Sequence, residues 1–214
     1  MTIAEPAVTL TDYGLVLECL ILGILLGRQK SKTTGGRQWF IVFFGALGLA
    51  AFMGGTAHGF IYDKSSLLHM VVWDLSLIGI GLVSLALWMI GLSLVSSPNV
   101  RLWSSRFVIA AFILYCGVVA LIMNTFLVAI VFYLPATLFL LTILGVKFLK
   151  QRKLYLLSGF SGLLLTFIAA GIQQSRLGLH PLWFDHNALY HLIQAVAILL
   201  LFHTARGLTL EEDL

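Results

Sequence analysis

Seven long apolar runs follow one another along this chain of 214 residues. Most of them span about 20 residues, the length that an α-helix needs to cross the hydrocarbon core of a bilayer. Hydrophobic residues make up 60% of the chain and charged residues 10%, which leaves no stretch for a separate soluble domain. The sequence therefore predicts an all-α integral membrane protein with one domain, residues 1–214, folded as a seven-transmembrane-helix bundle. The predicted helices cover residues 13–27, 39–61, 67–95, 106–124, 126–147, 154–175 and 186–205.

Polar residues mark two of the predicted helix boundaries. The fourth and fifth runs can be separated only by a tight turn near Asn124 and Thr125. The first run is preceded by residues 1–12, which lack the basic stretch of a cleaved signal peptide and end on Asp12. We place these twelve residues before the first helix.

Lysine and arginine are distributed unequally between the two ends of the predicted helices. Eleven of them follow the first, third, fifth and seventh runs, and only Lys64 and Arg176 fall at the opposite end. Under the positive-inside rule the N-terminus is outside and the C-terminus is cytoplasmic. The same distribution accounts for the net charge of +4 without a nucleic-acid partner, so membrane lipids are the expected surroundings. In a bacterium this location would be the inner, or cell, membrane.

Polar residues gather at the outer ends of these helices. Five of the six histidines fall in this layer, and Asp74 lies about one turn deeper than His69. Ionisable groups at membrane depth are costly and usually functional, so the layer is the predicted site. The five histidines are His58, His69, His180, His186 and His191.

Helical geometry separates the two histidines of the last run. Residues five apart on an ideal helix point about 140° from each other, so His186 and His191 cannot both face the bundle axis. Asn187 and His191 are four apart and can share one face. His186 then belongs either to a distorted first turn or to the helix cap, for which Asp185 is the predicted N-cap residue.

Clustered histidines predict a metal site. Three neutral imidazoles and a water form a catalytic zinc site, in which Zn²⁺ activates the water and polarises a carbonyl group. The predicted ligands are His58, His191 and either His186 or His69. Asp74 is the predicted catalytic residue, as a general base or as the partner that orients a histidine. A site in this layer, reached sideways from the bilayer, suits a lipid amide or ester.

The arrangement resembles the superfamily of the alkaline ceramidases and the adiponectin/progestin receptors, which are seven-helix membrane proteins described as zinc-dependent lipid hydrolases. That superfamily has a Ser four residues before a His in its second helix, an Asp early in the third, and HxxxH in the seventh. Here the corresponding residues are Gly54 and His58, then His69 and Asp74, then Asn187 and His191. Gly54 thus replaces the Ser, and Asn187 replaces the first His of HxxxH.

The resemblance implies a zinc-dependent hydrolase of a lipid amide or ester. The alternative is a non-enzymatic metal-binding protein, sensor or receptor, which the departures at Gly54 and Asn187 favour. A transporter would need polar residues through the full depth, and the cytoplasmic halves of the predicted helices are apolar. A retinal protein of the microbial rhodopsin type is excluded because the last run contains no lysine.

Overall fold

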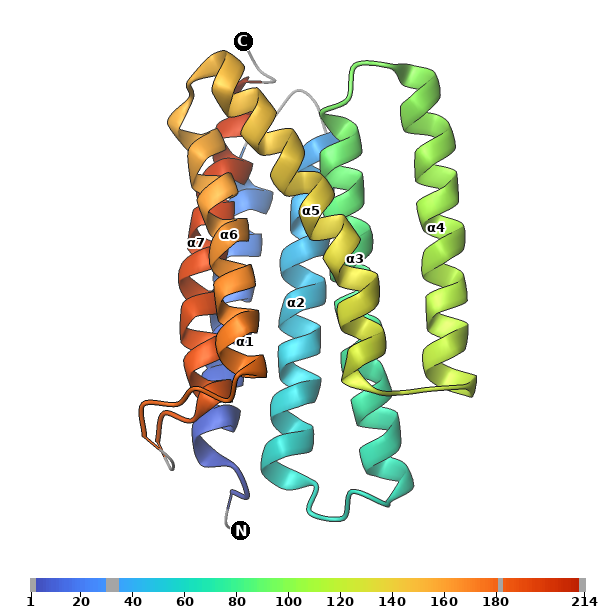
Figure 1. Ribbon diagram of the computed structural model, residues 1–214, viewed down its shortest axis with the longest axis vertical. Coiled ribbons are helices and arrows are strands. Elements are labelled where there is room, and N and C mark those ends of the chain that lie inside the picture. The colour runs from blue at the N-terminus through green and yellow to red at the C-terminus, as the bar shows by residue number, and fades with distance from the viewer. Residues whose placement is uncertain (1–2, 30–34, 181–182, 212–214) are drawn as a thin grey trace.

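The computed structural model describes residues 3–29, 35–180 and 183–211, and seven α-helices dominate it (Figure 1). Every one of them is long and apolar enough to cross a membrane. The predicted fold class is therefore confirmed, and the protein is an integral membrane protein. The helices are α1 (Pro6–Arg28), α2 (Gly35–Phe60), α3 (Leu67–Ser93), α4 (Pro98–Leu121), α5 (Phe126–Gln151), α6 (Leu154–Gln174) and α7 (His186–Glu211).

Helix α2 begins four residues before the predicted start, and two other helices begin earlier by seven residues or more. Helix α1 starts at Pro6 instead of residue 13, because a proline suits the first turn, where its missing N–H has no helical partner to lose. Helix α4 likewise starts at Pro98 instead of residue 106. The earlier start of α1 places Asp12 inside a transmembrane helix, whereas the sequence had placed it in the preceding tail.

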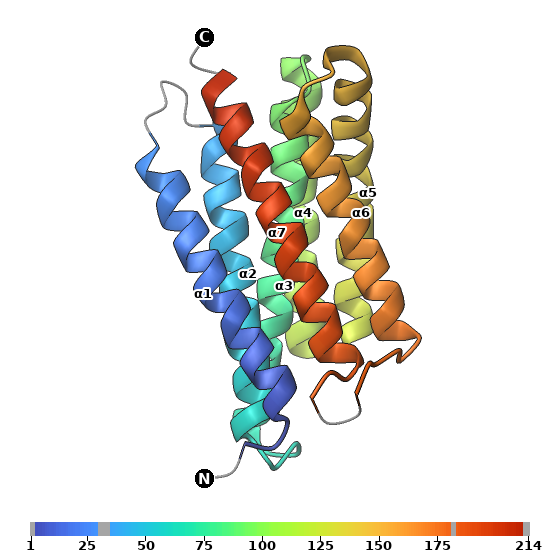
Figure 2. The same cartoon turned by 90° about the vertical axis from the view of Figure 1, so that its left-hand side faces the viewer.

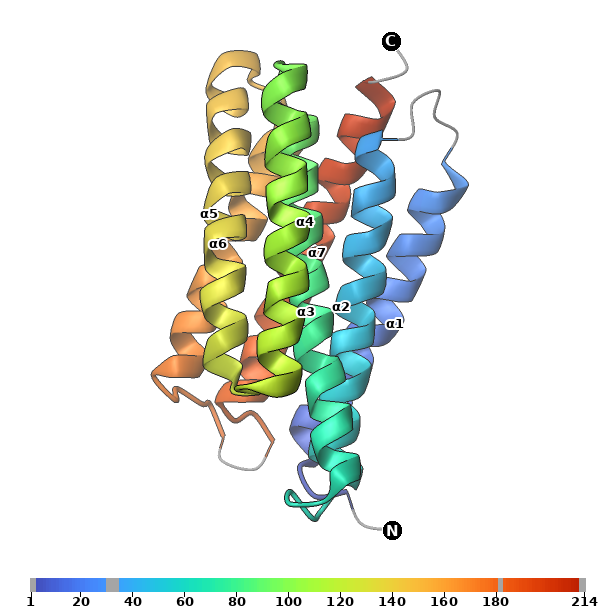
Figure 3. The same ribbon diagram turned by 90° about the vertical axis from the view of Figure 1, so that its right-hand side faces the viewer.

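Six of the helices form a closed ring. In the order α1, α2, α3, α5, α6 and α7, each packs against the next, and α7 returns to α1 (Figures 1 and 2). Helix α4 stands outside this ring against α3 and is the least buried of the seven (Figure 3). A site inside the ring can therefore receive side chains from every helix except α4.

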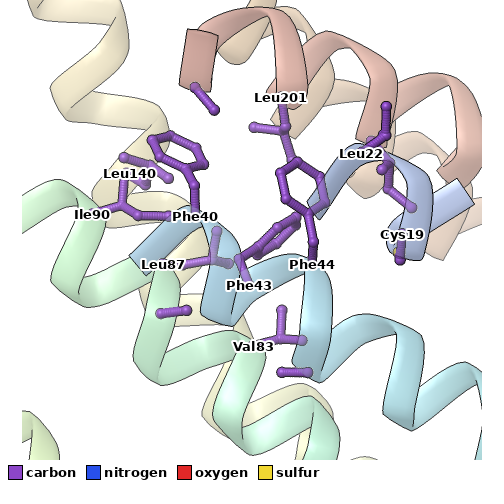
Figure 4. Close-up of a cluster of buried hydrophobic side chains, with 14 of the residues drawn as sticks. Cys19, Leu22, Phe40, Phe43, Phe44, Val83, Leu87, Ile90, Leu140 and Leu201 are labelled. Carbon is purple, nitrogen blue, oxygen red and sulfur yellow. The ribbon is translucent and has the colours of Figure 1, made fainter. Parts of the chain in front are cut away.

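The half of the bundle nearer the C-terminus is a packed apolar core. Phe43, Phe44, Leu87, Leu140 and Leu201 are almost completely buried there (Figure 4). The buried polar side chains that the structure describes near this end of α7, Thr204 and Thr209, donate their hydroxyl protons to backbone carbonyl oxygens. Buried Asp12 and Gln194 lie in the other half, toward the N-terminus, where the sequence predicted a polar layer.

Helices α1 and α2 approach closely in that second half. A Cβ atom added at Gly55 would lie 2.9 Å from Cβ of Asp12, and one added at Gly59 would lie 2.7 Å from side-chain atoms of Thr9. These two glycines let the helices pack closely, as small residues commonly do in membranes. At Gly54, by contrast, an added Cβ would remain 3.7 Å from Oδ2 of Asp12, which is an ordinary contact.

Candidate functional site

A polar cavity lies inside the ring, in the half that holds the N-terminus. Its volume is about 270 Å³, and all six ring helices contribute residues to its wall. Apolar side chains such as Leu15 and Leu47 form part of this wall. The other part carries hydrogen-bonding or ionisable groups: Asp12, His58, Trp73, Ser76, Gln173, Asn187, Tyr190, His191 and Gln194.

The ring of His191 is held between two residues of α1. Its Nδ1 lies 2.9 Å from Oγ1 of Thr11, and that hydroxyl also lies 2.9 Å from the carbonyl oxygen of Ala7 and 3.0 Å from that of Val8. A hydroxyl has one proton to give, and Thr11 gives it to these carbonyls. Thr11 therefore accepts from the Nδ1–H of His191, which makes Nε2 the nitrogen available for other contacts.

This Nε2 faces the carboxylate of Asp12. Nε2 of His191 lies 3.4 Å from Oδ1 of Asp12, beyond the usual N–H···O range of about 2.7–3.2 Å. Because Nδ1 carries the proton of the neutral ring, lone pairs on Nε2 and on the carboxylate oxygen would face each other and repel. A cation is needed between them, either a proton on one of the two groups or a metal ion. The Asp12–His191 pair is therefore a place where a proton or a metal ion would bind.

His58 is anchored in a similar way at the mouth of the cavity. Its Nδ1 lies 2.9 Å from Oε2 of Glu5, just before α1, and Lys64 approaches the other oxygen of Glu5 at 3.8 Å. The ring also packs edge-on against Trp73, with 6.1 Å between ring centroids. A carboxylate on Nδ1 orients a histidine so that its Nε2 can bind a ligand or a metal.

Helix α7 presents one polar stripe to the cavity. Asn187, Tyr190, His191 and Gln194 all line it, whereas His186, the first residue of the helix, does not. The predicted shared face of Asn187 and His191 is therefore confirmed. Asp185 caps the helix as predicted, since its Oδ1 accepts the N–H of Ala188 at 2.8 Å.

The structure separates the other sequence-derived candidates from this cavity. His69 stacks on Trp73 at a centroid distance of 6.4 Å, and although Trp73 lines the cavity, His69 does not. Asp74 accepts a hydrogen bond of 3.0 Å from Nδ2 of Asn124 in the loop before α5, and it does not line the cavity either. Of the four predicted metal ligands, His58 and His191 thus share the cavity, while His69 and His186 lie outside it.

Asn187, which stands where the resemblance would place a histidine, has a protein partner. Its Oδ1 accepts a hydrogen bond of 3.1 Å from Nε2 of Gln173 near the end of α6. This contact ties α6 to α7 at the end of the cavity nearest the connecting loop. The amide pair serves here as part of the polar wall.

The described side chains provide only part of the predicted metal site. Within residues 3–29, 35–180 and 183–211, no three His, Cys, Asp or Glu side chains are placed so that they could hold a metal ion together. One pair nevertheless has a suitable spacing. Two ligand atoms bound to a tetrahedral Zn²⁺ at roughly 2.0–2.2 Å lie about 3.3 Å apart. Nε2 of His191 and Oδ1 of Asp12 are separated by 3.4 Å.

A second, apolar cavity adjoins the first. Its volume is about 250 Å³, and it lies mainly between α5 and α6, where Ala129, Ile130, Phe167 and Ala170 contribute to its wall. Its edge reaches the surface, because Leu134 is 42% exposed. Figure 1 shows the first half of α5 leaning away from α6 at this level. Both cavities share six wall residues: Leu47, Ile80, Phe126, Gln173, Tyr190 and Gln194.

Several residues of this site were not predicted from the sequence, and Asp12 and Gln194 are two of them. Asp12 was missed because the first helix was thought to begin after it, although Pro6 followed by apolar residues is a typical helix start. Gln194 was not among the candidate residues either. Its position, three residues after His191 and seven after Asn187, places it on the same helix face and could have identified it.

The fold and the cavity together define a seven-helix membrane protein with a polar chamber inside its bundle. Residues 7–210 match a family of unknown function (DUF6962), and the chain belongs to this family. No curated protein and no solved structure matches the chain. The resemblance to the alkaline ceramidases therefore rests on the motif positions alone.

Proposed function

We propose that this protein binds an amphipathic, lipid-like molecule inside its helical ring. The polar head would lie in the cavity of Asp12, His58 and His191, and the hydrocarbon chain in the apolar cavity between α5 and α6. The observation that carries this proposal is the contact between the two cavities, which share six wall residues. Each cavity alone is smaller than the roughly 300–1,000 Å³ of most small-molecule sites, and the two together reach that range.

The polar cavity supplies what a head group needs. Asp12 accepts hydrogen bonds, and both histidines present Nε2 because their Nδ1 atoms are held by Thr11 and by Glu5. A hydroxyl or amide group placed among them finds acceptors in these three side chains, and donors in amide and hydroxyl groups of the same wall, such as those of Asn187 and Tyr190. Polar groups in a buried site are stable only when they are hydrogen-bonded, so the cavity favours a ligand with such groups.

The apolar cavity gives the chain a route from the bilayer. Leu134 on α5 and Gln174 on α6 line it and are exposed on the outer face of the bundle. A lipid tail can enter between these helices without crossing water. The ligand is therefore one that partitions into membranes.

Binding can be measured with the purified protein in detergent micelles or nanodiscs. We expect saturable, one-to-one binding of N-hydroxyethyl dodecanamide, which combines a polar head with a hydrocarbon chain. N-hydroxyethyl acetamide, which has the head but no chain, should bind far more weakly, and so should dodecane, which has no head. Equal binding of the amide and dodecane would contradict the proposal, because it would show partition into the apolar surface.

A second candidate is the zinc-dependent lipid amidase or esterase that the family resemblance implies. The observation that favours it is the 3.4 Å separation between Nε2 of His191 and Oδ1 of Asp12, with His58 on the same cavity wall. Asp12 and His191 would hold the ion, and His58 would complete the site only after its side chain moves toward them. Zinc would supply an activated water and a polarised carbonyl group at the head of the bound lipid.

Metal analysis distinguishes the two candidates. If the protein is a zinc hydrolase, the purified wild type should contain about one zinc per chain, and Asp12→Ala and His191→Ala should lose it. His186→Ala, which alters a histidine outside the cavity, is the matched control and should retain the metal. If the wild type contains no metal and still binds the amide, the result would support the binding function and rule out the zinc hydrolase.

A further inference from the structure

One buried polar group in the site has no protein partner. Gln194 is only 5% exposed, and its buried side-chain Oε1 forms no hydrogen bond with any residue that the structure describes. A buried carbonyl oxygen left without a donor destabilises the folded state. The missing donor must come from a molecule inside the bundle.

The position of Gln194 shows where that molecule is recognised. Gln194 is one of the residues that line both cavities, and it follows His191 by three positions on α7. A rise of about 1.5 Å per residue puts it about 4.5 Å deeper than His191 along the helix. Gln194 therefore lies at the level where the polar head of a bound amphipathic ligand would join its hydrocarbon chain.

We infer that Gln194 selects ligands that carry an N–H or O–H donor at the junction of head and chain, so that a fatty amide binds in preference to the matching ester. The inference rests on the proposed function, because it specifies the ligand of the same two cavities. An amide N–H reaches Oε1 of Gln194 and satisfies it. An ester presents only acceptors at this position and leaves Oε1 unpaired.

Water offers the alternative explanation, since a water molecule can also donate to a buried oxygen. In that case Gln194 would be solvated in the bound and the free protein alike, and it would not discriminate between ligands. The test must therefore compare ligands that differ only in the donor.

The experiment uses three probes with the same chain and the same terminal hydroxyl: N-hydroxyethyl dodecanamide, its N-methyl derivative, and hydroxyethyl dodecanoate. For the wild type we expect the secondary amide to bind at least about fivefold more tightly than the ester or the N-methyl amide. In Gln194→Met the advantage of the secondary amide over the ester should disappear, because the affinity for the secondary amide falls while the affinity for the ester stays close to that of the wild type.

Methionine is the substitution of choice because it is similar in length and adds no unpaired polar atom. The ligand-free Gln194→Met protein should be as stable as the wild type or more stable, which separates loss of recognition from loss of folding. Gln151→Met, at an exposed position at the end of α5, is the control and should keep the preference.

The possible results distinguish a failure of the role of Gln194 from a failure of the proposed lipid binding. Saturable binding of all three probes with equal affinity would overturn the role of Gln194 and leave the binding function intact. A preference for the amide that persists in Gln194→Met would also overturn it. If none of the probes binds the wild type saturably, the proposed ligand class fails, and the inference fails with it.

Discussion

Leucine in place of His191 is expected to lower the free energy of unfolding by about 3–5 kcal/mol, the cost of removing one member of a buried pair of ionisable groups. Asp12 is buried, and its Oδ1 faces Nε2 of His191. Without the imidazole, the buried carboxyl group of Asp12 loses the partner on α7 that shares a proton or a metal ion with it. Thermal unfolding in detergent, followed by circular dichroism, would measure the loss.

A double-mutant cycle shows whether the loss comes from the pair. The variant Asp12→Leu/His191→Leu removes both polar groups, so it should be more stable than His191→Leu alone. His186→Leu, on the first turn of α7 and outside the cavity, is the matched control and should cost less than about 1 kcal/mol. Additive effects of the two single substitutions would mean that Asp12 and His191 do not interact.

Phenylalanine in place of Ala170 is expected to weaken binding of N-hydroxyethyl dodecanamide by about tenfold or more, equivalent to at least about 1.4 kcal/mol. Ala170 lies on α6 in the wall of the apolar cavity and is half-buried. A phenyl ring there would occupy the space assigned to the hydrocarbon chain. A titration of the reconstituted protein with the amide measures the change in affinity.

The same substitution at Ala110 supplies the control. Ala110 is exposed on α4, outside the ring, and lines neither cavity. Ala110→Phe should therefore bind the probe with the affinity of the wild type. A folded Ala170→Phe protein that binds just as tightly would show that the chain does not occupy the apolar cavity.

The sequence predicted most of the fold, because seven apolar runs of membrane-spanning length admit few other structures. The sequence also predicted the level of the site along the helices. His58 and His191 are far apart in the chain, were assigned to the same layer, and line one cavity. The N-cap at Asp185 followed from local chemistry. The placement of the N-terminus outside the membrane remains a prediction from the distribution of lysine and arginine.

The choice among residues at the same depth could not be predicted. His69 and Asp74 lie in the expected layer, but the packing of α3 turns His69 onto Trp73 and brings Asp74 to Asn124. Hydropathy gives the depth of a residue in a helix, whereas its direction depends on which helices become neighbours. The contact between α1 and α7 brought Asp12 to His191, and no local pattern encodes it.

Asp12 also illustrates how a helix boundary affects a functional prediction. A charged residue at the edge of an apolar run is easily assigned to the adjoining tail. Here Pro6 begins the helix, and Gly55 leaves the space that the side chain of Asp12 occupies. Both the helix start and the small residue on the facing helix are needed to place this carboxylate inside the bundle.

Photolabelling tests the two-cavity account most directly. A derivative of N-hydroxyethyl dodecanamide with a diazirine at the end of its chain would be activated on the reconstituted protein, and the labelled residues identified by peptide mass spectrometry. The account predicts labels on the walls of the apolar cavity, at residues such as Ile130 and Phe167, that excess unlabelled amide removes. Labels spread over lipid-facing residues such as Phe107 and Leu114 of α4, and unaffected by competitor, would contradict it.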